Sequence, residues 1–246
     1  ISPDDDCWCP DLDPVNYPDG TDASGLAHVL SDDVTMSPER GLFLPESYRM
    51  HPNVCAYISE MFYEGKLVSE PNRAKQKLIH QDFPEGTGLW YYPVEHFGNQ
   101  NSSIEESECV AQLIRLLLDN GEWVDHESNQ HELKLEDILV VSPYNAQVGE
   151  IARRIENVRV GTVDKFQGQQ APVVIISYAT STAEEAPRGM DFLYSLNRLN
   201  VAASRAKCVV FLVCSPELIR PECSNPKQMR LANGLCRFVE LAHPQT

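Results

Sequence analysis

Short runs that are apolar at nearly every position alternate along the chain with segments whose apolar residues recur at helical spacing. The apolar runs predict buried strands at ILVVS (138–142), VVIISYA (173–179) and CVVFLVC (208–214), with further strand candidates at GLFL (41–44), LWYYPV (89–94) and the alternating VRVGTV (158–163). Strands that are apolar on both faces and alternate with helices indicate a parallel sheet covered on both sides. The pattern therefore predicts an α/β doubly wound domain over about 41–220.

Helical spacing marks the segments between these strands. The segment 51–65 ends at Gly65 and has one apolar face, formed by Val54, Tyr57, Ile58, Met61 and Phe62. A helix over 104–118 begins with a capping box of Ser103 and Glu106, and its apolar face holds Val110, Leu113, Ile114 and Leu117. Further helices are predicted after Ser142, with Val148, Ile151 and Ile155 on one face, and across 196–206. The polar stretch 119–134 is predicted to be a loop.

Two flanking regions differ from this domain in composition. Residues 1–40 are rich in Pro, Asp and Gly and hold nine Asp and one Glu against one Arg, which indicates an acidic, loop-rich lead-in. The tail 221–246 carries one predicted helix, around 227–241.

The formal charge of −16 argues against indiscriminate coating of nucleic acid. The charge is uneven, because residues 151–210 hold eight Lys or Arg against five acids. Binding of a polyanion to this segment therefore stays open.

Neither a membrane span nor a secretory signal is predicted. No apolar run reaches 18 residues, and the sequence opens with the acidic ISPDDDCWCP. The eight cysteines include no CxxC pair, and Cys208 and Cys214 lie inside an apolar run, where a thiol acts as a small hydrophobic group. We expect a reduced, cytoplasmic protein without a metal site.

Polar segments follow three of the predicted strands, and ligands of open parallel sheets bind at the carboxyl ends of strands. These segments are PESYRMHP after GLFL, SPYNAQ after ILVV and TVDKFQGQQ after VRVG. Ser142 is a candidate cap that leaves backbone N–H groups open to a phosphate. Arg205 differs, because it precedes its strand. Taken alone, SPYNAQ is better explained as a plain strand-to-helix turn, TVDKFQGQQ is only weak evidence for a phosphate site, and Arg49 could bind an anion or pair with a surface acid.

Taken together, these segments favour a domain that grips phosphates. They supply Arg, Thr, Ser, Gln and Tyr, while GxSxG, HExxH and arrays of CxxC are missing from the sequence. Nucleophilic and zinc-dependent chemistry of the common types is therefore not indicated.

Four of these motifs, in order, resemble a known family. YRMHP, SPYNAQV, VGTVDKFQGQ and LNRLNVAASRAK are similar to the later motifs of superfamily 1 helicases, over about 41–219. The resemblance is to the AAA-type, 5′-to-3′ branch that contains the nonsense-mediated-decay and Okazaki-fragment helicases. GLFLPESYRMHPNVCAYISEMFYEGKL and APRGMDFLYSLNRLNVA further resemble a bacterial group fused to a RecB-like nuclease.

The resemblance implies the second of two RecA-like motor domains, with ATP bound between them. The phosphate loop GxxxxGK[ST] and the acidic Mg²⁺ motif belong to the first domain, and neither occurs here; GTGLW (86–90) lacks the lysine. The chain alone is therefore expected not to hydrolyse ATP. Residues 1–40 would come from the stretch that joins the two domains.

The resemblance also assigns nucleotide-binding residues. Arg205 corresponds to the arginine finger on the γ-phosphate, Arg49 to a second γ-phosphate contact and Tyr48 to the stacking partner of adenine. A positioned guanidinium accelerates phosphoryl transfer by about 10³–10⁵. Gly168 and Gln170 fall at the nucleotide as well, and Gln170 replaces the family's ribose-binding glutamate, so the charge is lost.

Single-stranded nucleic acid, with DNA favoured through the nuclease-linked group, is the implied partner. The strand-binding positions are Ser142, Pro143, Tyr144, Thr162, Lys165 and Gln167. A solvated side chain is the simpler interpretation of Lys165, and Arg198 divides evenly between a ligand contact and an ion pair within the domain. Asn197, Asn200 and Ser204 are interpreted as structural, and His51 as a residue that starts a helix. A non-catalytic binding module derived from a helicase is the alternative function.

Overall fold

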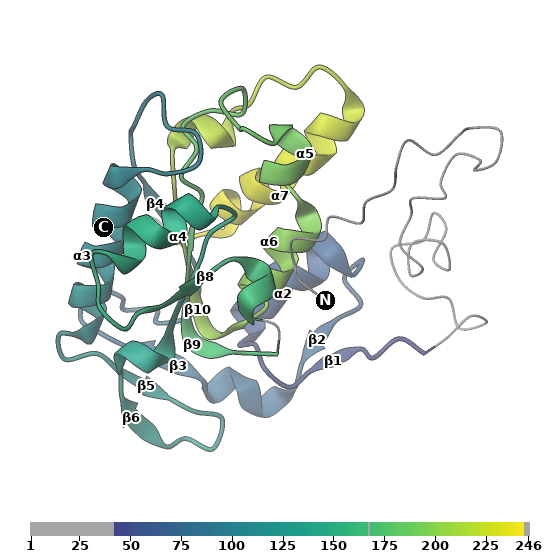
Figure 1. The fold of residues 1–246 in the computed structure, drawn as a ribbon. Coiled ribbons are helices and arrows are strands. Elements are labelled where there is room, and N and C mark those ends of the chain that lie inside the picture. The colour runs from purple at the N-terminus through teal and green to yellow at the C-terminus, as the bar shows by residue number, and fades with distance from the viewer. Residues whose placement is uncertain (1–41, 167, 244–246) are drawn as a thin grey trace. The chain divides into compact units, whose positions relative to one another are not determined.

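Five parallel strands form the central sheet, in the spatial order β4-β10-β9-β7-β8 (Figure 1). The computed structural model describes residues 42–166 and 168–243. The strands are β4 (Gly88–Pro93), β7 (Ile138–Val141), β8 (Arg159–Gly161), β9 (Ala171–Ser177) and β10 (Ala206–Cys214). The predicted fold class, an α/β RecA-like fold built on a mainly parallel sheet, is confirmed.

Alternate residues of each central strand enter two separate hydrophobic cores. In β10, Val210, Leu212 and Cys214 face one core, whereas Val209, Phe211 and Val213 face the other. All six side chains are fully buried. This burial on both sides is the physical reason that the strand is apolar at almost every position.

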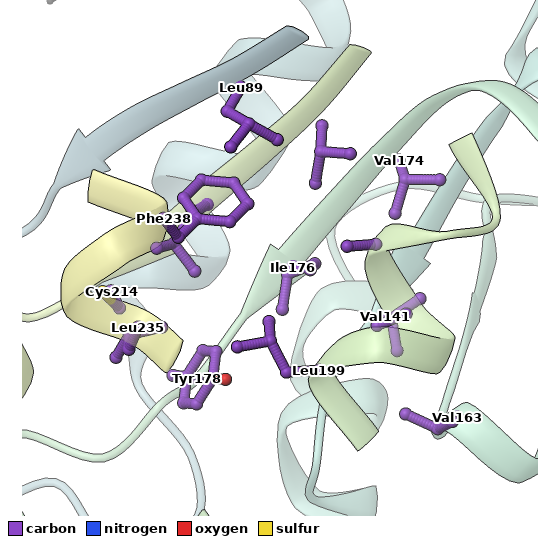
Figure 2. Packing of buried hydrophobic residues seen from close by; sticks show 14 of the residues in the cluster. Leu89, Val141, Val163, Val174, Ile176, Tyr178, Leu199, Cys214, Leu235 and Phe238 are labelled. Carbon is purple, nitrogen blue, oxygen red and sulfur yellow. The ribbon is translucent and has the colours of Figure 1, made fainter. Parts of the chain in front are cut away.

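Helices cover both faces of the sheet (Figure 1). One core is closed by α3 (Ile104–Leu118) and α4 (Asn145–Ala152), and the other by α2 (Pro52–Phe62), α6 (Leu196–Ala203) and α7 (Pro226–Leu241). Figure 2 shows Leu235 and Phe238 of α7 among side chains of the sheet such as Leu89 and Ile176. The Tyr57 hydroxyl of α2 donates to the Gly234 carbonyl of α7 at 2.8 Å. Helix α7 thus shares the core of the sheet.

Smaller elements surround this frame. The short strands β1 (Glu46–Ser47) and β2 (Val68–Ser69) pair in parallel, and a short helix α5 (Gly189–Leu193) precedes α6. The single-turn helices are η1 (Pro71–Lys75), η2 (Leu135–Asp137), η3 (Val163–Phe166) and η4 (Pro216–Ile219). From Pro45 onward the described residues form one compact unit. None of their helices has the length and apolar content to cross a membrane.

The loop predicted for 119–134 is wrong. This stretch contains the hairpin β5 (Glu122–Val124) and β6 (Gln130–Glu132), which pairs with β3 (Lys77–Ile79) into an antiparallel sheet. Its strands are short and mostly polar, and one buried side chain, Trp123, anchors it on the core. The backbone turn is held by Asp125, whose carboxylate accepts from the backbone N–H groups of Glu127 and Asn129.

Four other local predictions also need correction. Residues 42–44 of the predicted strand GLFL form no strand, and Gly41 lies outside the described residues. Ser103 does cap α3, but the Glu106 side chain does not return to it, because that carboxylate is buried elsewhere. Tyr144, not Ser142, occupies the N-cap of α4. Helix α6 ends at Ala203 instead of continuing to 206, because the chain there enters β10.

Candidate functional site

The predicted site residues divide between the two edges of the sheet. Ser142 follows β7 and Thr162 follows β8, so both lie at the carboxyl edge. Gln170 and Arg205 directly precede β9 and β10 and lie at the opposite, amino edge, where the Ala171 N–H donates to the Arg205 carbonyl. The expectation of a carboxyl-edge site for TVDKFQGQQ was therefore half wrong, since this segment crosses from one edge to the other.

Arg49 reaches the amino edge from the segment before α2. Its guanidinium donates to the Ser204 carbonyl at 2.9 Å, and its own carbonyl accepts from the Gln76 side chain at 2.8 Å. The following His51 N–H donates to the Lys207 carbonyl. These contacts fix the YRMHP segment against the start of β10.

A cleft of about 380 Å³ opens beside Arg49 and gathers residues that are far apart in the sequence. Tyr48, Arg49 and Gln170 all line it, together with Ser204 next to Arg205. Tyr48 is exposed, and its hydroxyl donates to Glu46, a contact that raises the pKa of Tyr48. Gly168 does not line this cleft; it is exposed with φ +80°, a left-handed conformation that favours glycine.

The Arg205 side chain is 4% exposed and lies inside its own domain. Its guanidinium donates to the backbone carbonyls of Val163 and Gln169, each at 3.2 Å, and to that of Phe166. Burial, and then the nearby charge of Arg49, lower the pKa of Arg205. The finger candidate therefore bonds to the backbone of Val163, Phe166 and Gln169.

Two guanidinium groups thus lie close together at the amino edge. Neither Arg49 nor Arg205 forms an ion pair with a carboxylate of the described residues. Like charges held together in this way favour an anion that would neutralise both.

At the carboxyl edge the predicted side chains are buried. Ser142 is fully buried and Tyr144 is 6% exposed, and burial raises the pKa of Tyr144. What this edge offers is backbone: no side chain caps the first turn of α4, and that turn holds no acidic residue. Uncapped N–H groups at a helix start attract phosphate.

The remaining strand candidates lie along the connecting segment. Thr162 is half-buried, and its carbonyl accepts from the Lys165 N–H. The Lys165 ammonium donates to the Val160 carbonyl at 2.9 Å and lies over the Phe166 ring. Pro143 lines a small cavity of about 20 Å³ with Ser142 and Tyr178. Gln167 lies outside the described residues.

Sequence reasoning missed two arrangements at the carboxyl edge, although it named Arg198 with its role left open between a ligand contact and an ion pair. The guanidiniums of Arg188 and Arg198 each lie 4.2 Å from the centre of the Phe192 ring, which also contacts the Tyr144 ring. A fully buried carboxylate, Glu106, also bonds to the end of β9. The spacing of Arg188, Phe192 and Arg198 was the sequence signal for the cluster around the Phe192 ring. Glu106 was missed because its spacing from Ser103 was interpreted as a capping box.

No group of three or more His, Cys, Asp or Glu side chains within 42–166 and 168–243 is placed to hold a metal ion. The fold and its two edges define an α/β domain of the RecA type, with paired arginines at one edge and an open helix start at the other.

A family profile described as an AAA domain matches residues 26–217, and the chain belongs to that family. It is 31% identical over 184 residues to the DNA polymerase alpha-associated DNA helicase A of Schizosaccharomyces pombe, a match that covers 68% of this chain and 27% of the helicase. It is 29% identical over 190 residues to a regulator of nonsense transcripts 1 homolog of Neurospora crassa, covering 72% and 17%. The chain is thus homologous to helicases of superfamily 1.

Among solved structures, the C-terminal domain of a possible DNA helicase from a Lactobacillus is similar with a TM-score of 0.37 and 15% identity, covering 74% of this chain and 96% of that one. The chain spans less than a third of the length of the two curated relatives named above.

Proposed function

We propose that this chain is the second motor domain of an ATP-dependent superfamily 1 helicase. It supplies the arginine finger and part of the track for the single strand, and hydrolysis requires a first RecA-like domain that carries the phosphate loop. Membership of the AAA-domain family and homology to named helicases support the motor assignment.

The observation that carries the proposal is the convergence of three distant segments on one cleft. Tyr48 and Arg49, Gln170, and Ser204 beside Arg205 all border it. A triphosphate fits this site, because Arg49 lines the cleft without an ion-pair partner among the described residues, Arg205 lies close behind it, and Gln170 can bond a hydroxyl. Glu46 also lines the cleft, where its carboxylate accepts from the Tyr48 hydroxyl. ATP, with Mg²⁺ held by the first domain, supplies the transferable phosphoryl group.

Each side chain has a separate task in this arrangement. Arg49 binds the terminal phosphate, Arg205 stabilises the charge that develops on its oxygens, and Tyr48 offers an exposed ring for the base. Arg205 must first leave the carbonyls of Val163, Phe166 and Gln169. Closure of the two domains on ATP would provide the phosphate that draws it out, which makes hydrolysis depend on closure.

The single strand would lie along the carboxyl edge. The uncapped start of α4 and the half-buried Thr162 would donate to backbone phosphates, and Lys165 would add a positive charge. Contacts of this kind are independent of sequence and sensitive to salt, with a log–log slope of about −0.7 per phosphate neutralised.

The test is the steady-state ATPase rate of the full-length protein, with and without single-stranded DNA, for wild type and Arg205→Ala. We expect strand-stimulated turnover that collapses in the variant. Arg237→Ala is the matched control, because Arg237 forms surface ion pairs with Glu60 and Glu240 away from the cleft. A normal rate in Arg205→Ala would show that this arginine is not the finger.

A non-catalytic binding module is the second candidate. Two observations favour it: both terminal nitrogens of the Arg205 guanidinium donate to backbone carbonyls, and Gln170 lacks the charge of the family's glutamate. No turnover in the full-length wild type, combined with intact strand binding, would support this candidate.

The choice between DNA and RNA, and an attached RecB-like nuclease, follow only from the closer resemblance to the bacterial group. Comparing stimulation by DNA and RNA strands of one sequence tests the first. Nuclease activity that depends on a domain outside 1–246 tests the second.

A further inference from the structure

A chain of buried polar groups connects α3 to the carboxyl edge of the sheet. The Glu106 carboxylate, fully buried, accepts from the Ser177 hydroxyl at 2.7 Å and from the Ala179 N–H at 2.9 Å, and its other oxygen lies 3.0 Å from His96 Nε2. His96 Nδ1 lies 2.7 Å from the Ser181 hydroxyl. A buried carboxylate is costly unless several donors satisfy it, and here three do so.

The hydrogen positions in this chain follow from its two ends. The Asn99 N–H donates to Ser181 Oγ, and the arrangement that uses the Ser181 hydroxyl hydrogen has it donate to His96 Nδ1. His96 then carries its own hydrogen on Nε2 and donates it to Glu106. With the His96 hydrogen on Nε2, every polar group of this chain has a partner.

This arrangement resembles a hydrolytic triad of serine, histidine and acid, but it has no access to a substrate. Ser181 and Glu106 are fully buried and His96 is 3% exposed. None of the three lines any of the cavities described above. The group must therefore act by holding its surroundings in place.

What it holds is an unusual bend directly after β9. Ala179 has φ +69°, a left-handed conformation that residues with a Cβ rarely adopt, and its N–H is the one that Glu106 accepts. Next to it, the Tyr178 ring lines the small cavity together with Ser142 and Pro143. The Thr180 hydroxyl lies near the Tyr144 hydroxyl and lowers its pKa, against the larger raising effect of burial.

The same group also reaches α4. The Gln147 amide donates to Ser177 Oγ at 2.9 Å and accepts from the Ser103 N–H at 2.8 Å. Gln147 lies in the first turn of α4, the open helix start proposed to bind phosphate. Both the bend after β9 and the helix start are thus tied to Glu106.

We infer that Glu106 is a positioning residue for strand binding: its buried carboxylate holds Ala179 in the left-handed bend and so sets the geometry of the carboxyl edge around Tyr144. This inference rests on the proposed function, because it needs a strand to bind at that edge. Glu106 acts only through Ala179, Ser177 and Gln147.

The test measures the affinity of the full-length protein for a labelled single strand without nucleotide, and kcat for ATP at saturating strand. Glu106→Leu removes every acceptor and should weaken strand binding about tenfold, the order of the penalty for a left-handed alanine. Glu106→Gln keeps one acceptor oxygen and should lose about threefold. We expect kcat at saturating strand to stay within about twofold of wild type in both.

Ala179→Gly separates positioning from loss of stability. Glycine adopts the left-handed bend without help, so adding it to either Glu106 variant should recover most of the lost affinity, whereas alone it should change little. Tyr57→Phe is the matched control, since it removes a buried hydrogen bond to Gly234 in α7. It should lower the melting temperature without changing strand affinity.

The outcomes are distinguishable. If wild type binds strand and both Glu106 variants bind equally well, the positioning role is wrong and the motor assignment stands. If Glu106→Leu does not fold, Glu106→Gln decides: a loss that Ala179→Gly recovers supports the role, and wild-type affinity overturns it. If wild type itself neither binds strand nor turns over ATP, the proposed function fails, and this inference fails with it.

Discussion

The amino and carboxyl edges of the sheet have opposite construction. At the amino edge an open cleft of about 380 Å³ is lined by Tyr48 and Gln170, which are exposed, and by Arg49, which carries a charge. At the carboxyl edge the side chains of Ser142 and Tyr144 are buried, and the cavity beside Ser142 measures about 20 Å³. One edge offers charged side chains and the other offers backbone. Phosphoryl transfer requires charged side chains, whereas sequence-independent binding of a strand uses backbone groups.

The segment 162–170 joins the two edges, and Arg205 lies against it. Thr162 begins the segment at the carboxyl edge and Gln170 ends it at the amino edge. The Arg205 guanidinium bonds to three carbonyls in between. If Arg205 moved onto a phosphate at the amino edge, it would therefore release the segment that leads to the carboxyl edge.

The largest expected effect is the loss of turnover in a variant of the amino edge that leaves strand binding at the carboxyl edge unchanged. Arg49→Ala should lower kcat by about 10³ or more, because it removes a charge that acts only on the nucleotide. Strand affinity without nucleotide should stay unchanged, since the Arg49 guanidinium donates to the Ser204 carbonyl and lies at the amino edge, away from the proposed strand site. Weaker strand binding in this variant would contradict the separation.

Arg205→Ala should lower both turnover and strand affinity, because Arg205 lies at the amino edge and bonds to the segment that leads to the carboxyl edge. In addition to lost turnover, strand affinity without nucleotide should fall about tenfold as the segment 163–169 loses its donors. The free energy of unfolding should fall by about 1–3 kcal/mol, measured by urea denaturation, because three carbonyls lose a buried partner. Unchanged strand affinity would mean that the guanidinium contacts do not set the strand site.

The sheet was predictable from the sequence because each central strand is buried on both faces. Residues 208–214 could hardly be apolar throughout for any other reason, and the extent of α3 was predicted correctly for 104–118. The hairpin at 122–132 was not predictable, since its short polar strands carry one anchoring tryptophan and no periodicity.

The candidate site was predictable only in part. Motif order identified Arg49, Gln170 and Arg205, but not the edge at which they meet, because strand order is not written in local spacing. The role of Glu106 was hidden for a similar reason. Its spacing from Ser103 fits a local cap, whereas its actual partners Ser177 and Ala179 lie more than 70 residues away.

Moderate effects on strand affinity and on its salt dependence distinguish a charged contact from a hydroxyl contact at the carboxyl edge. Lys165→Met should reduce the magnitude of the log–log salt slope of strand binding by about 0.7 if its ammonium neutralises one phosphate. Thr162→Val should weaken binding about threefold to tenfold and leave the slope unchanged, because a hydroxyl releases no counterion. Titrations with labelled strand at several salt concentrations measure both. An unchanged slope in Lys165→Met would show that Lys165 only stabilises its own turn through the Val160 carbonyl.

The smallest expected effect is on KM for ATP and concerns Gln170 at the amino edge. Its exposed amide lines the cleft with Tyr48 and Arg49 and is proposed to bond a ribose hydroxyl. Gln170→Glu would convert that bond into a charge-assisted one, so KM for ATP should fall about threefold with kcat unchanged. With 2′,3′-dideoxy-ATP, which lacks both ribose hydroxyls, the gain should disappear. An equal change with both nucleotides would place Gln170 away from the ribose and assign the effect to the charge alone, acting on Arg49.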